Sequence, residues 1–432
     1  MKFKAATWLS ARVKVVAPAA AAACAVVLGI IWPCAAGQIP TEPPQVLSAR
    51  YLLPPDMLAG PLFRVDDRVP TDGYMGQYTL RSEVGTFTVV SRDLLKIRIA
   101  ELAAIEQLEA TSKTDVFLSG AARAAERPVE AVVNIVTNPV GTVESLPSGI
   151  SRFFDRVEVG AKAIAESAAD TSKSSDQRVQ ETAQRVGDVT ITAMGYEQVH
   201  RQLAKSLGVD PYTTNPVLAK KITDVAWVAF SARLGVDLLM SAAVPGSTFI
   251  SLTSITSDLV YDTPKADLIV ALQQKLMRMG ASEAVAGALI KNRWYSLTVL
   301  TTLVTELERL GGVKGRPDIV ALATTAANEE EARFLAASVQ VLARLNVTGM
   351  PLKAMIARRT AVGVTPGGAL VLPAPVDYLS WTEQIARIAA QRDLHAPRRG
   401  LWLSGRMSPR AQYGLSELGW AIHEAPTLTG AR

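Results

Sequence analysis

Apolar residues recur every three or four positions over much of the chain, which is the spacing of helices with one buried face. The first such stripe begins after Ser91 and continues to about Thr111. Serine, asparagine and Thr-Pro sequences precede later stripes, and these are typical helix starts. We therefore expect a helical bundle over residues 191–312, with helices at 196–207, 215–230, 264–279 and 297–310 and another capped by Ser282.

Patterns typical of strands appear in two places. Gln77–Ser82 and Thr86–Val90 flank Glu83-Val84-Gly85, which predicts a hairpin. After Gly315 short apolar runs alternate with helical stripes, and the final run predicts a βαβ unit with two parallel strands and a right-handed crossover. In this C-terminal part we expect strands at 319–323, 354–358, 369–372, 401–404 and 420–423, and helices at 329–345, 380–391 and 410–418.

The predicted fold class is α+β and mostly helical. It has an N-terminal hairpin with amphipathic helices, a helical bundle in the middle and a small C-terminal α/β domain. Residues 38–73 contain seven prolines, which disfavour helix and indicate an extended spacer that either lifts the body off the membrane or lies along the surface of the body. The predicted divisions are 1–37 as a signal peptide or membrane anchor, 38–73 as the spacer, 74–190 as hairpin and amphipathic helices, 191–312 as the bundle and 313–424 as the α/β domain.

Residues 128–157 form the most unusual stretch, because valines make one helical stripe and prolines interrupt it. An apolar stripe of this kind usually faces a neighbouring sheet or bundle, which is the favoured interpretation. The alternative is a segment that lies in a membrane surface or binds an envelope partner. Arg152 and Arg156 beside Phe153-Phe154 favour the membrane, whereas four nearby acids disfavour an anionic leaflet: Glu130, Glu144, Asp155 and Glu158.

The first 37 residues have the pattern of an export signal. Basic residues precede an uncharged apolar run that begins at Val15, and Ala35-Ala36-Gly37 offers small residues for cleavage. Cleavage is favoured over a retained anchor, although the run is nearly long enough to span a bilayer. Both cysteines, Cys24 and Cys34, fall in this segment, so a cleaved chain has no thiols. We expect the protein in the periplasm, or on the inner membrane facing the periplasm.

The net charge of +5 is misleading, because four of the 45 Lys and Arg residues lie in the signal segment before the first acidic residue, Glu42. Without those four, 41 basic residues face 40 acidic ones. A nucleic-acid surface needs a concentrated basic excess. The composition therefore disfavours nucleic acid as a partner.

Few residues of the chain offer chemistry. His200 is expected at a helix boundary or in the core, and His395 in a solvated loop. Metalloprotease, paired Cys/His, nucleophile-elbow, phosphate-loop and EF-hand motifs do not occur in the sequence. We therefore assign no catalytic residue, expect no metal site and infer no cofactor.

One local arrangement suggests ligand binding. Ser404-Gly405-Arg406 follows a predicted strand and precedes a helix capped by Ser408. Ligands of open α/β sheets bind at strand carboxyl ends, and an arginine there would bind a carboxylate or phosphate. Thr324 and Thr325 would lie at the same edge if 319–323 is a neighbouring parallel strand, and His423 would be an acid/base partner. The alternative, which is favoured, is a tight turn at Gly405 with Arg406 paired to a surface acid.

Three strings resemble those of an uncharacterised family of exported bacterial proteins with no known activity: LGVDPYTTNPVL at 207–218, GGVKGRPDIVALAT at 311–324 and LWLSGRMSPRAQYGLSELGW at 401–420. The resemblance covers most of residues 75–424. It implies export and a shared fold, but no activity or site.

Two hypotheses about function follow. The first is a cell-envelope protein of structural or interaction type. The second is an envelope enzyme or small-anion binder that uses the strand end near Arg406.

Overall fold

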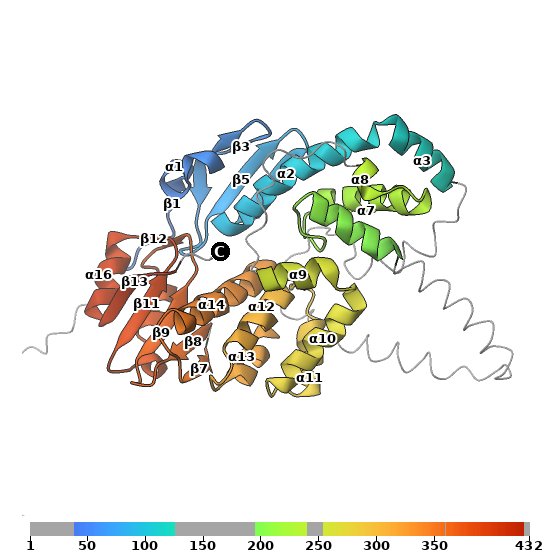
Figure 1. Cartoon of the computed structure of the whole chain (residues 1–432). Coiled ribbons are helices and arrows are strands. Elements are labelled where there is room, and N and C mark those ends of the chain that lie inside the picture. The colour runs from blue at the N-terminus through green and yellow to red at the C-terminus, as the bar shows by residue number, and fades with distance from the viewer. Residues whose placement is uncertain (1–38, 126–194, 240–253, 359, 427–432) are drawn as a thin grey trace, which may run out of the picture. The chain divides into compact units, whose positions relative to one another are not determined.

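The computed structural model describes residues 39–125, 195–239, 254–358 and 360–426 (Figure 1). The chain divides after Pro40, and residues from Thr41 onward form one compact unit. Among the described residues of that unit, far more lie in helices than in strands, which confirms the predicted mostly helical α+β class. The predicted signal segment and the valine-rich stretch 128–157 lie outside the described residues.

An antiparallel sheet forms from the N-terminal residues, in the order β2-β3-β5-β6. The predicted hairpin is confirmed as its last two strands, paired from Gln77 with Val90 to Ser82 with Gly85. Tyr78, Leu80 and Val89 alternate with more exposed residues and are buried, so one face of the sheet meets the core. The strands are β2 (Ala59–Gly60), β3 (Phe63–Val65), β5 (Gln77–Ser82) and β6 (Gly85–Val90).

The predicted helix after Ser91 is confirmed as α2 (Arg92–Ser112). The Ser91 side chain accepts a hydrogen bond from the Leu94 amide, as an N-cap should. The helix packs against β5 and β6 and buries Leu95 and Ile105 completely. The next helix, α3 (Asp115–Ala125), packs against α7 (Pro216–Ser231).

The proline-rich residues 46–70 pack against the rest of the chain, so the prediction of an extended spacer that lifts the body off the membrane is wrong for them, and the alternative of a segment that lies along the body is closer to the structure. Leu52, Leu53 and Met57 lie between the prolines and are buried in the core that contains α2. Apolar residues at these positions favour burial over an extended, solvated segment. The local elements are β1 (Val46–Ser48), paired with β4 (Arg68–Pro70), the short helix α1 (Ala49–Leu52) and a 3-10 turn, η1 (Pro55–Met57).

The helices predicted in the middle of the chain are confirmed. Residues 195–206 are helical, Asn215 caps α7, and Ser282 and Ser296 cap two later helices. The remaining helices are α8 (Val236–Leu239), α9 (Ser254–Asp262), α10 (Lys265–Arg278), α11 (Glu283–Ile290) and α12 (Leu297–Arg309).

These helices do not share one core, as a separate bundle would. Helix 195–206 and α7 pack into the core of the N-terminal sheet and α2. Helices α10, α11 and α12 pack instead into a second core with the C-terminal sheet. The hydrophobic cores therefore cross the boundaries that the sequence pattern predicts at residues 190 and 312.

The expected strand 319–323 is also wrong, because these residues belong to helix α13 (Arg316–Ala323). Pro317 at the second helical position is a helix-start signal. Gly315 before it has φ +84°, and a Cβ there would lie 2.0 Å from the Met355 carbonyl oxygen, so only glycine fits. The following helix is confirmed as α14 (Glu329–Val347), capped by Asn328.

The C-terminal sheet has the order β13-β11-β9-β8-β7. Strands β9, β11 and β13 are parallel, which confirms the βαβ unit, and β8 pairs antiparallel with β7 and β9. Helix α14 contacts β8 and β9. The elements are β7 (Ala354–Ala357), β8 (Ala361–Val364), β9 (Leu370–Ala374), α15 (Glu383–Ala389), η2 (Arg392–Leu394), β11 (Arg399–Leu403), α16 (Pro409–Glu417) and β13 (Trp420–Glu424).

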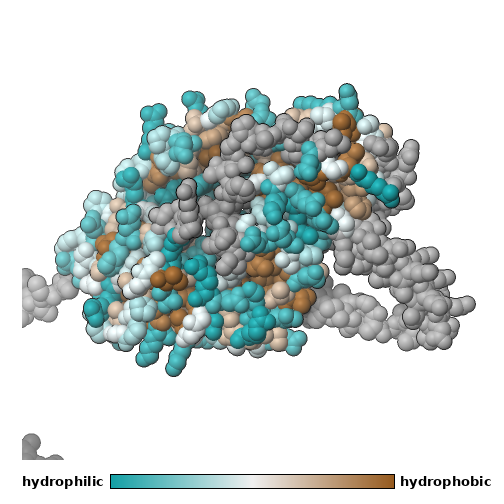
Figure 2. Space-filling view, viewed as in Figure 1, coloured by the Kyte–Doolittle hydropathy of each residue, from teal (hydrophilic) through white to brown (hydrophobic). Residues whose placement is uncertain are grey.

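A short parallel pair lies beyond the carboxyl ends of β9 and β11. It joins β10 (Tyr378–Leu379) to β12 (Arg406–Met407). This is the place where an open α/β sheet usually binds its ligands. On the face seen in Figure 2, hydrophobic residues form separate patches among hydrophilic ones.

Candidate functional site

Residues 404–406 pack directly on the chain that leaves β9. The Ser404 amide donates to the Ala374 carbonyl at 3.1 Å, and the Arg406 amide donates to the Asp377 carbonyl at 3.0 Å. A Cβ at Gly405 would lie 2.2 Å from the carbonyl oxygens of both Val376 and Asp377. The glycine therefore allows a close backbone contact, which fits the tight-turn interpretation.

The Asp377 carboxyl is the most connected group at this strand end. It accepts hydrogen bonds from the amide of Arg92, at 3.1 and 3.0 Å to its two oxygens, from the Gly76 amide at 3.0 Å and from the Tyr78 hydroxyl at 3.2 Å. Arg92 is the first residue of α2, so the carboxyl lies at the N-terminus of that helix. A negative group is stabilised there by the unpaired amides and the helix dipole.

Burial has the larger effect on this group. It raises the pKa of Asp377 to about 6, although the hydrogen bonds from Gly76 and Arg92 oppose the rise. Burial and the neighbouring Asp377 also raise the pKa of Tyr78. The carboxyl is thus held in a polar but nearly dry environment, because Asp377 is only 6% exposed.

The segment before β5 is docked onto the same place. The amides of Asp377 and Tyr378 both donate to the Tyr74 carbonyl, and the Ser380 amide donates to the Gly73 carbonyl at 2.8 Å. We call the contact between residues 73–92 and residues 374–380 and 404–406 the strand-end junction. In it, the N-terminal part of the chain occupies the position that a ligand of an α/β sheet would take.

Ser91 adds local strain to this junction. Its φ of +81° and ψ of 145° lie in a region that residues with a side chain rarely adopt. The Ser91 amide donates to the Gly76 carbonyl at 2.9 Å, and its hydroxyl caps α2. These two contacts hold the residue in place.

Among the described residues, no surface acid pairs with Arg406, contrary to the favoured interpretation. The Arg406 guanidinium lies over the Tyr51 ring, 4.6 Å from the ring centre, and Tyr51 meets the Tyr378 ring edge-on. The Arg406 residue is exposed. The Arg92 guanidinium is close to the same loop, because it donates a long hydrogen bond of 3.5 Å to the Ser404 carbonyl.

A second carboxylate lies at the start of α16. Glu42 accepts hydrogen bonds from the Ser408 hydroxyl and from the Trp381 amide, the latter at 2.7 Å. Ser408 is the N-cap of α16, and its hydroxyl also accepts from the Ala411 amide. The residues just after Pro40 are therefore tied to the C-terminal domain.

The other predicted ligand residues do not join this site. Thr324 and Thr325 follow a helix rather than a strand, and their hydroxyls bond back to the carbonyls of Ala321 and Leu322. The Thr324 carbonyl is held by the Asn292 side chain. The structure thus brings Ser404, Gly405 and Arg406 together in one loop but not with the two threonines.

His423 lies on β13 beside Trp402 of β11. The two rings are stacked, with centres 4.6 Å apart. Gly400 makes room for this pair, because a Cβ there would lie 2.4 Å from the Trp402 ring. His423 is exposed, and its ring packs on the Trp402 ring.

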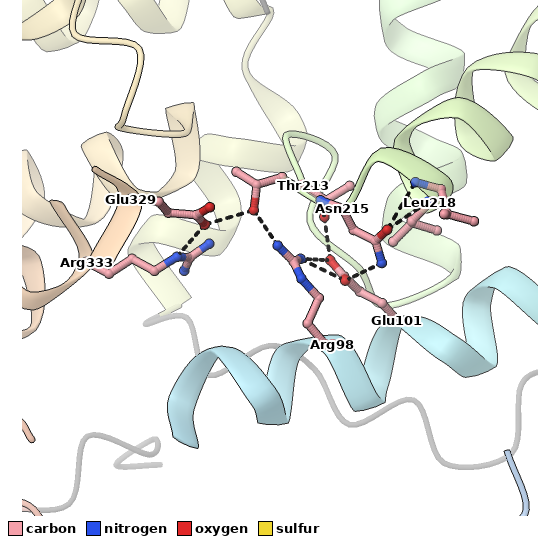
Figure 3. A network of polar contacts seen from close by, with 9 residues as sticks. Arg98, Glu101, Thr213, Asn215, Leu218, Glu329 and Arg333 are labelled. Carbon is pink, nitrogen blue, oxygen red and sulfur yellow. Dashed lines mark hydrogen bonds and ion pairs between the residues drawn. The ribbon is translucent and has the colours of Figure 1, made fainter. Parts of the chain in front are cut away.

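A network of buried polar residues lies further along α2 (Figure 3). Glu101 is completely buried and accepts two hydrogen bonds from the Arg98 guanidinium, at 2.9 and 3.1 Å. It also accepts from the Asn215 amide at 2.9 Å and from the Thr213 hydroxyl. Asn215 uses its other side-chain atom, Oδ1, to cap α7. We call these residues, with those of the next paragraph, the Glu101 network.

The network continues to α14. The Thr214 hydroxyl accepts from Arg98 at 2.6 Å and donates to Glu329 at 2.8 Å, and Arg333 donates to the same Glu329 oxygen at 2.7 Å. The loop 210–215 therefore connects α2, α7 and α14 through side chains with matched donors and acceptors. Matched networks of this kind rigidify a protein and specify one packing.

Asp210 ties the same loop to α12. It accepts from the Thr298 hydroxyl at 2.5 Å and from the Tyr212 amide at 2.8 Å. Burial raises the pKa of Asp210 to about 6, and the Thr298 hydrogen bond opposes the rise. The loop thus contacts helices from both hydrophobic cores.

Sequence reasoning missed Asp377, Glu42, Glu101 and Asp210. A signal was available for one of them, because Arg98 and Glu101 continue the buried stripe of α2 between Leu94 and Ile105 at steps of three and four residues. Charged residues on an apolar face are rarely buried unless paired. Asp377 and Glu42 gave no such signal, since their partners are hundreds of residues away along the chain.

Comparison of the chain with protein-family models, curated proteins and solved structures found no match. The resemblance to exported bacterial proteins therefore stays a prediction. Within the described residues, no group of three or more His, Cys, Asp or Glu side chains is arranged to hold a metal ion. In the same parts of the chain, every helix is too short or too polar to cross a bilayer.

Proposed function

We propose that this protein is a cell-envelope protein of structural or interaction type. The observation that carries the proposal is that the strand end of the C-terminal sheet, where such sheets bind ligands, is taken by the protein's own residues 73–92 and Asp377. The basic and apolar first 37 residues support export to the periplasm or to the periplasmic side of the inner membrane.

Fractionation of a bacterial host that expresses the full chain tests the location. We expect the product in the periplasmic or inner-membrane fraction, and N-terminal sequencing to find a start after Gly37 where the signal is cleaved. An untrimmed product in the cytosol would remove the basis of the proposal.

The partner in this proposal is a membrane surface or an envelope protein bound through residues 128–157. The valine stripe and the Arg-flanked Phe153-Phe154 support it. The test is flotation of the mature full chain with vesicles of mixed zwitterionic and anionic lipids. Phe153→Asp/Phe154→Asp should abolish flotation, and Val270→Asp on exposed α10 should not. No flotation of the parent chain would exclude the membrane version.

The second candidate is an enzyme or small-anion binder near Arg406. It is supported by the exposed guanidinium of Arg406 and the neighbouring Arg92, both close to the carboxyl end of β11. A screen of phosphate and small carboxylates by thermal shift tests it on the full mature chain. A shift lost in Arg406→Ala but kept in the control Arg410→Ala would support this candidate, and equal shifts in both would reject it.

A further inference from the structure

Residues 41–45 lie on the C-terminal domain as a bound peptide would. The Glu42 amide donates to the Trp381 carbonyl at 2.9 Å, and the Glu42 carboxylate accepts from the Trp381 amide at 2.7 Å and from the Ser408 hydroxyl. A further hydrogen bond, 3.3 Å long, joins Arg410 to the carbonyl before Glu42. The same small set of groups therefore contacts both the backbone and the acidic side chain of this segment.

Little apolar surface holds segment 41–45 in place. Pro43 and Pro44 are exposed and Glu42 is half-buried. The two hydrophobic cores, in the part of the chain that the structure describes, contain no residue of the segment. A segment that is held at the surface by polar contacts opens more readily than one that is packed in a core. Segment 41–45 can therefore leave the C-terminal domain while both cores stay intact.

The groups that bind Glu42 are fixed by the C-terminal domain itself. Ser408 is completely buried and caps α16 through the Ala411 amide. Trp381 is also buried and packs against Gly414 of that helix, where a Cβ would lie 2.5 Å from the Trp381 ring. A site that is formed in advance loses little conformational freedom when it binds a ligand. The site therefore keeps its shape when the segment leaves.

Positive charge beside this site favours an acidic ligand. The N-terminus of α16 contributes unpaired amides and the positive end of the helix dipole. Arg410 in its first turn is exposed, and so is Arg406 on β12, whose partner strand β10 ends two residues before Trp381. Among the residues that the structure describes, neither arginine pairs with a carboxylate: Arg406 lies over a tyrosine ring and Arg410 donates to a carbonyl.

We propose that the Trp381 backbone and the start of α16 form a binding site for an extended acidic peptide with proline after the glutamate. Segment 41–45 occupies this site in cis, and a Glu-Pro segment of an envelope partner protein displaces it. Proline after the acid favours the extended backbone, as Pro43 does for Glu42, so the ligand loses little freedom on binding. The site is separate from residues 128–157, so this proposal stands or falls independently of the membrane test.

NMR of nitrogen-15 tryptophan amides in the mature chain tests the site. The Trp381 amide donates to Glu42 and is assigned with carbonyl-13C serine, because Trp381 is the tryptophan that follows a serine. In Glu42→Ala this signal should move, and acetyl-Thr-Glu-Pro-Pro-Gln-amide should return it to the parent position. The control peptide acetyl-Thr-Gln-Pro-Pro-Gln-amide should need an at least about tenfold higher concentration, because a charged acceptor makes the stronger hydrogen bonds.

Controls separate the site from general effects. In the parent and in Glu417→Ala, at the other end of α16, the Trp381 signal should need an at least about tenfold higher peptide concentration, because Glu42 already fills the site. Unchanged signals of Trp402 and Trp420 show that a variant is folded, and Glu42→Gln replaces Glu42→Ala if that variant is not. No response to the acidic peptide in the folded variant, or equal responses to both peptides, would overturn the proposal.

Discussion

Two buried carboxyl groups lie along helix α2 and have different kinds of hydrogen-bond partners. At its N-terminus Asp377 accepts hydrogen bonds from backbone amides and a tyrosine hydroxyl. Near its middle Glu101 accepts two hydrogen bonds from the Arg98 guanidinium and further ones from Asn215 and Thr213. The first group therefore has dipoles as partners, and the second has a full positive charge.

This difference determines whether each region responds mainly to the loss of a side chain or to a change in pH. A paired buried charge is costly to break, because the remaining partner is left uncompensated. A buried carboxyl that is held by dipoles responds instead to pH, since protonation removes the cost of its burial. We expect the stability of the Glu101 network to fall when one of its side chains is truncated. We expect the stability of the strand-end junction to depend on pH.

The largest effect is expected from Glu101→Leu. It leaves the Arg98 guanidinium, which is 10% exposed, and the Asn215 amide without their partner. Loss of one member of a buried pair costs about 3–5 kcal/mol in the free energy of unfolding. Urea denaturation at neutral pH measures this loss.

Two controls sharpen that result. Glu109→Leu removes a more exposed carboxylate of α2, paired with Lys221, and should cost at most about 1 kcal/mol. The double change Arg98→Met/Glu101→Leu should cost less than Glu101→Leu alone, because no charge is left unpaired. Equal losses for Glu101→Leu and Glu109→Leu would mean that burial of the network does not matter.

The next largest effect concerns pH and Asp377→Asn. Between about pH 3.8 and pH 6 the folded chain holds the Asp377 proton more tightly than the unfolded chain. The contribution of this group to stability is therefore fully present below that window and is lost as the pH rises through 6. The difference in unfolding free energy between parent and variant should change by about 3 kcal/mol at most.

Urea denaturation of both proteins at several pH values between about 4 and 8 measures this difference. Asp210 and His200 titrate in both proteins, so their contributions cancel in the comparison. A difference that does not vary with pH would contradict the claim that the hydrogen bonds of Asp377 only partly offset the cost of burying its charge.

A smaller effect is expected from Glu42→Ala. This carboxylate also lies at a helix N-terminus, that of α16, but it is only half-buried. Its removal takes a charged acceptor away from the buried Ser408 hydroxyl and from the Trp381 amide, and a hydrogen bond to a charged group contributes about 1.5–3 kcal/mol. We expect a loss near the lower value by thermal or urea unfolding, and none in the exposed control Glu417→Ala.

The smallest effect is a gain of stability in Ser91→Gly. Glycine adopts a positive φ without the strain that serine has there, and it loses only a few tenths of a kcal/mol as an N-cap. We expect about 1 kcal/mol of added stability. Ser91→Ala keeps the strain and loses the cap, so it should be less stable than the parent. If Ser91→Gly is less stable than the parent, the positive φ of Ser91 does not destabilise the folded chain.

Local signals in the sequence predicted most elements of the fold. Capping residues such as Ser91, Asn215 and Ser408 lie next to the helices they start, so a short window of sequence contains both. The parallel βαβ unit was also predictable, because its strands and helix are consecutive. The packing of residues 46–70 was not predictable, because their prolines indicate an extended segment whereas their apolar residues pack against elements that are distant in the sequence.

The candidate site was predictable only in part. The loop at Ser404, Gly405 and Arg406 followed from one strand and one helix. Asp377 at the same place did not, because its partners at Gly76 and Arg92 are about three hundred residues away. Thr324 and Thr325 were misplaced because a helix start at Gly315-Arg316-Pro317 was interpreted as part of a boundary.

Titration of Asp377 itself tests the contrast between the two regions most directly. Carbon-13 NMR of aspartate side-chain carboxyls, with Asp377→Asn to assign the signal, gives the pKa of this one group in the folded chain. The account predicts a value near 6, raised by burial. A value near 4 would mean that the amides and Tyr78 balance the charge fully, and it would contradict the difference drawn between Asp377 and Glu101.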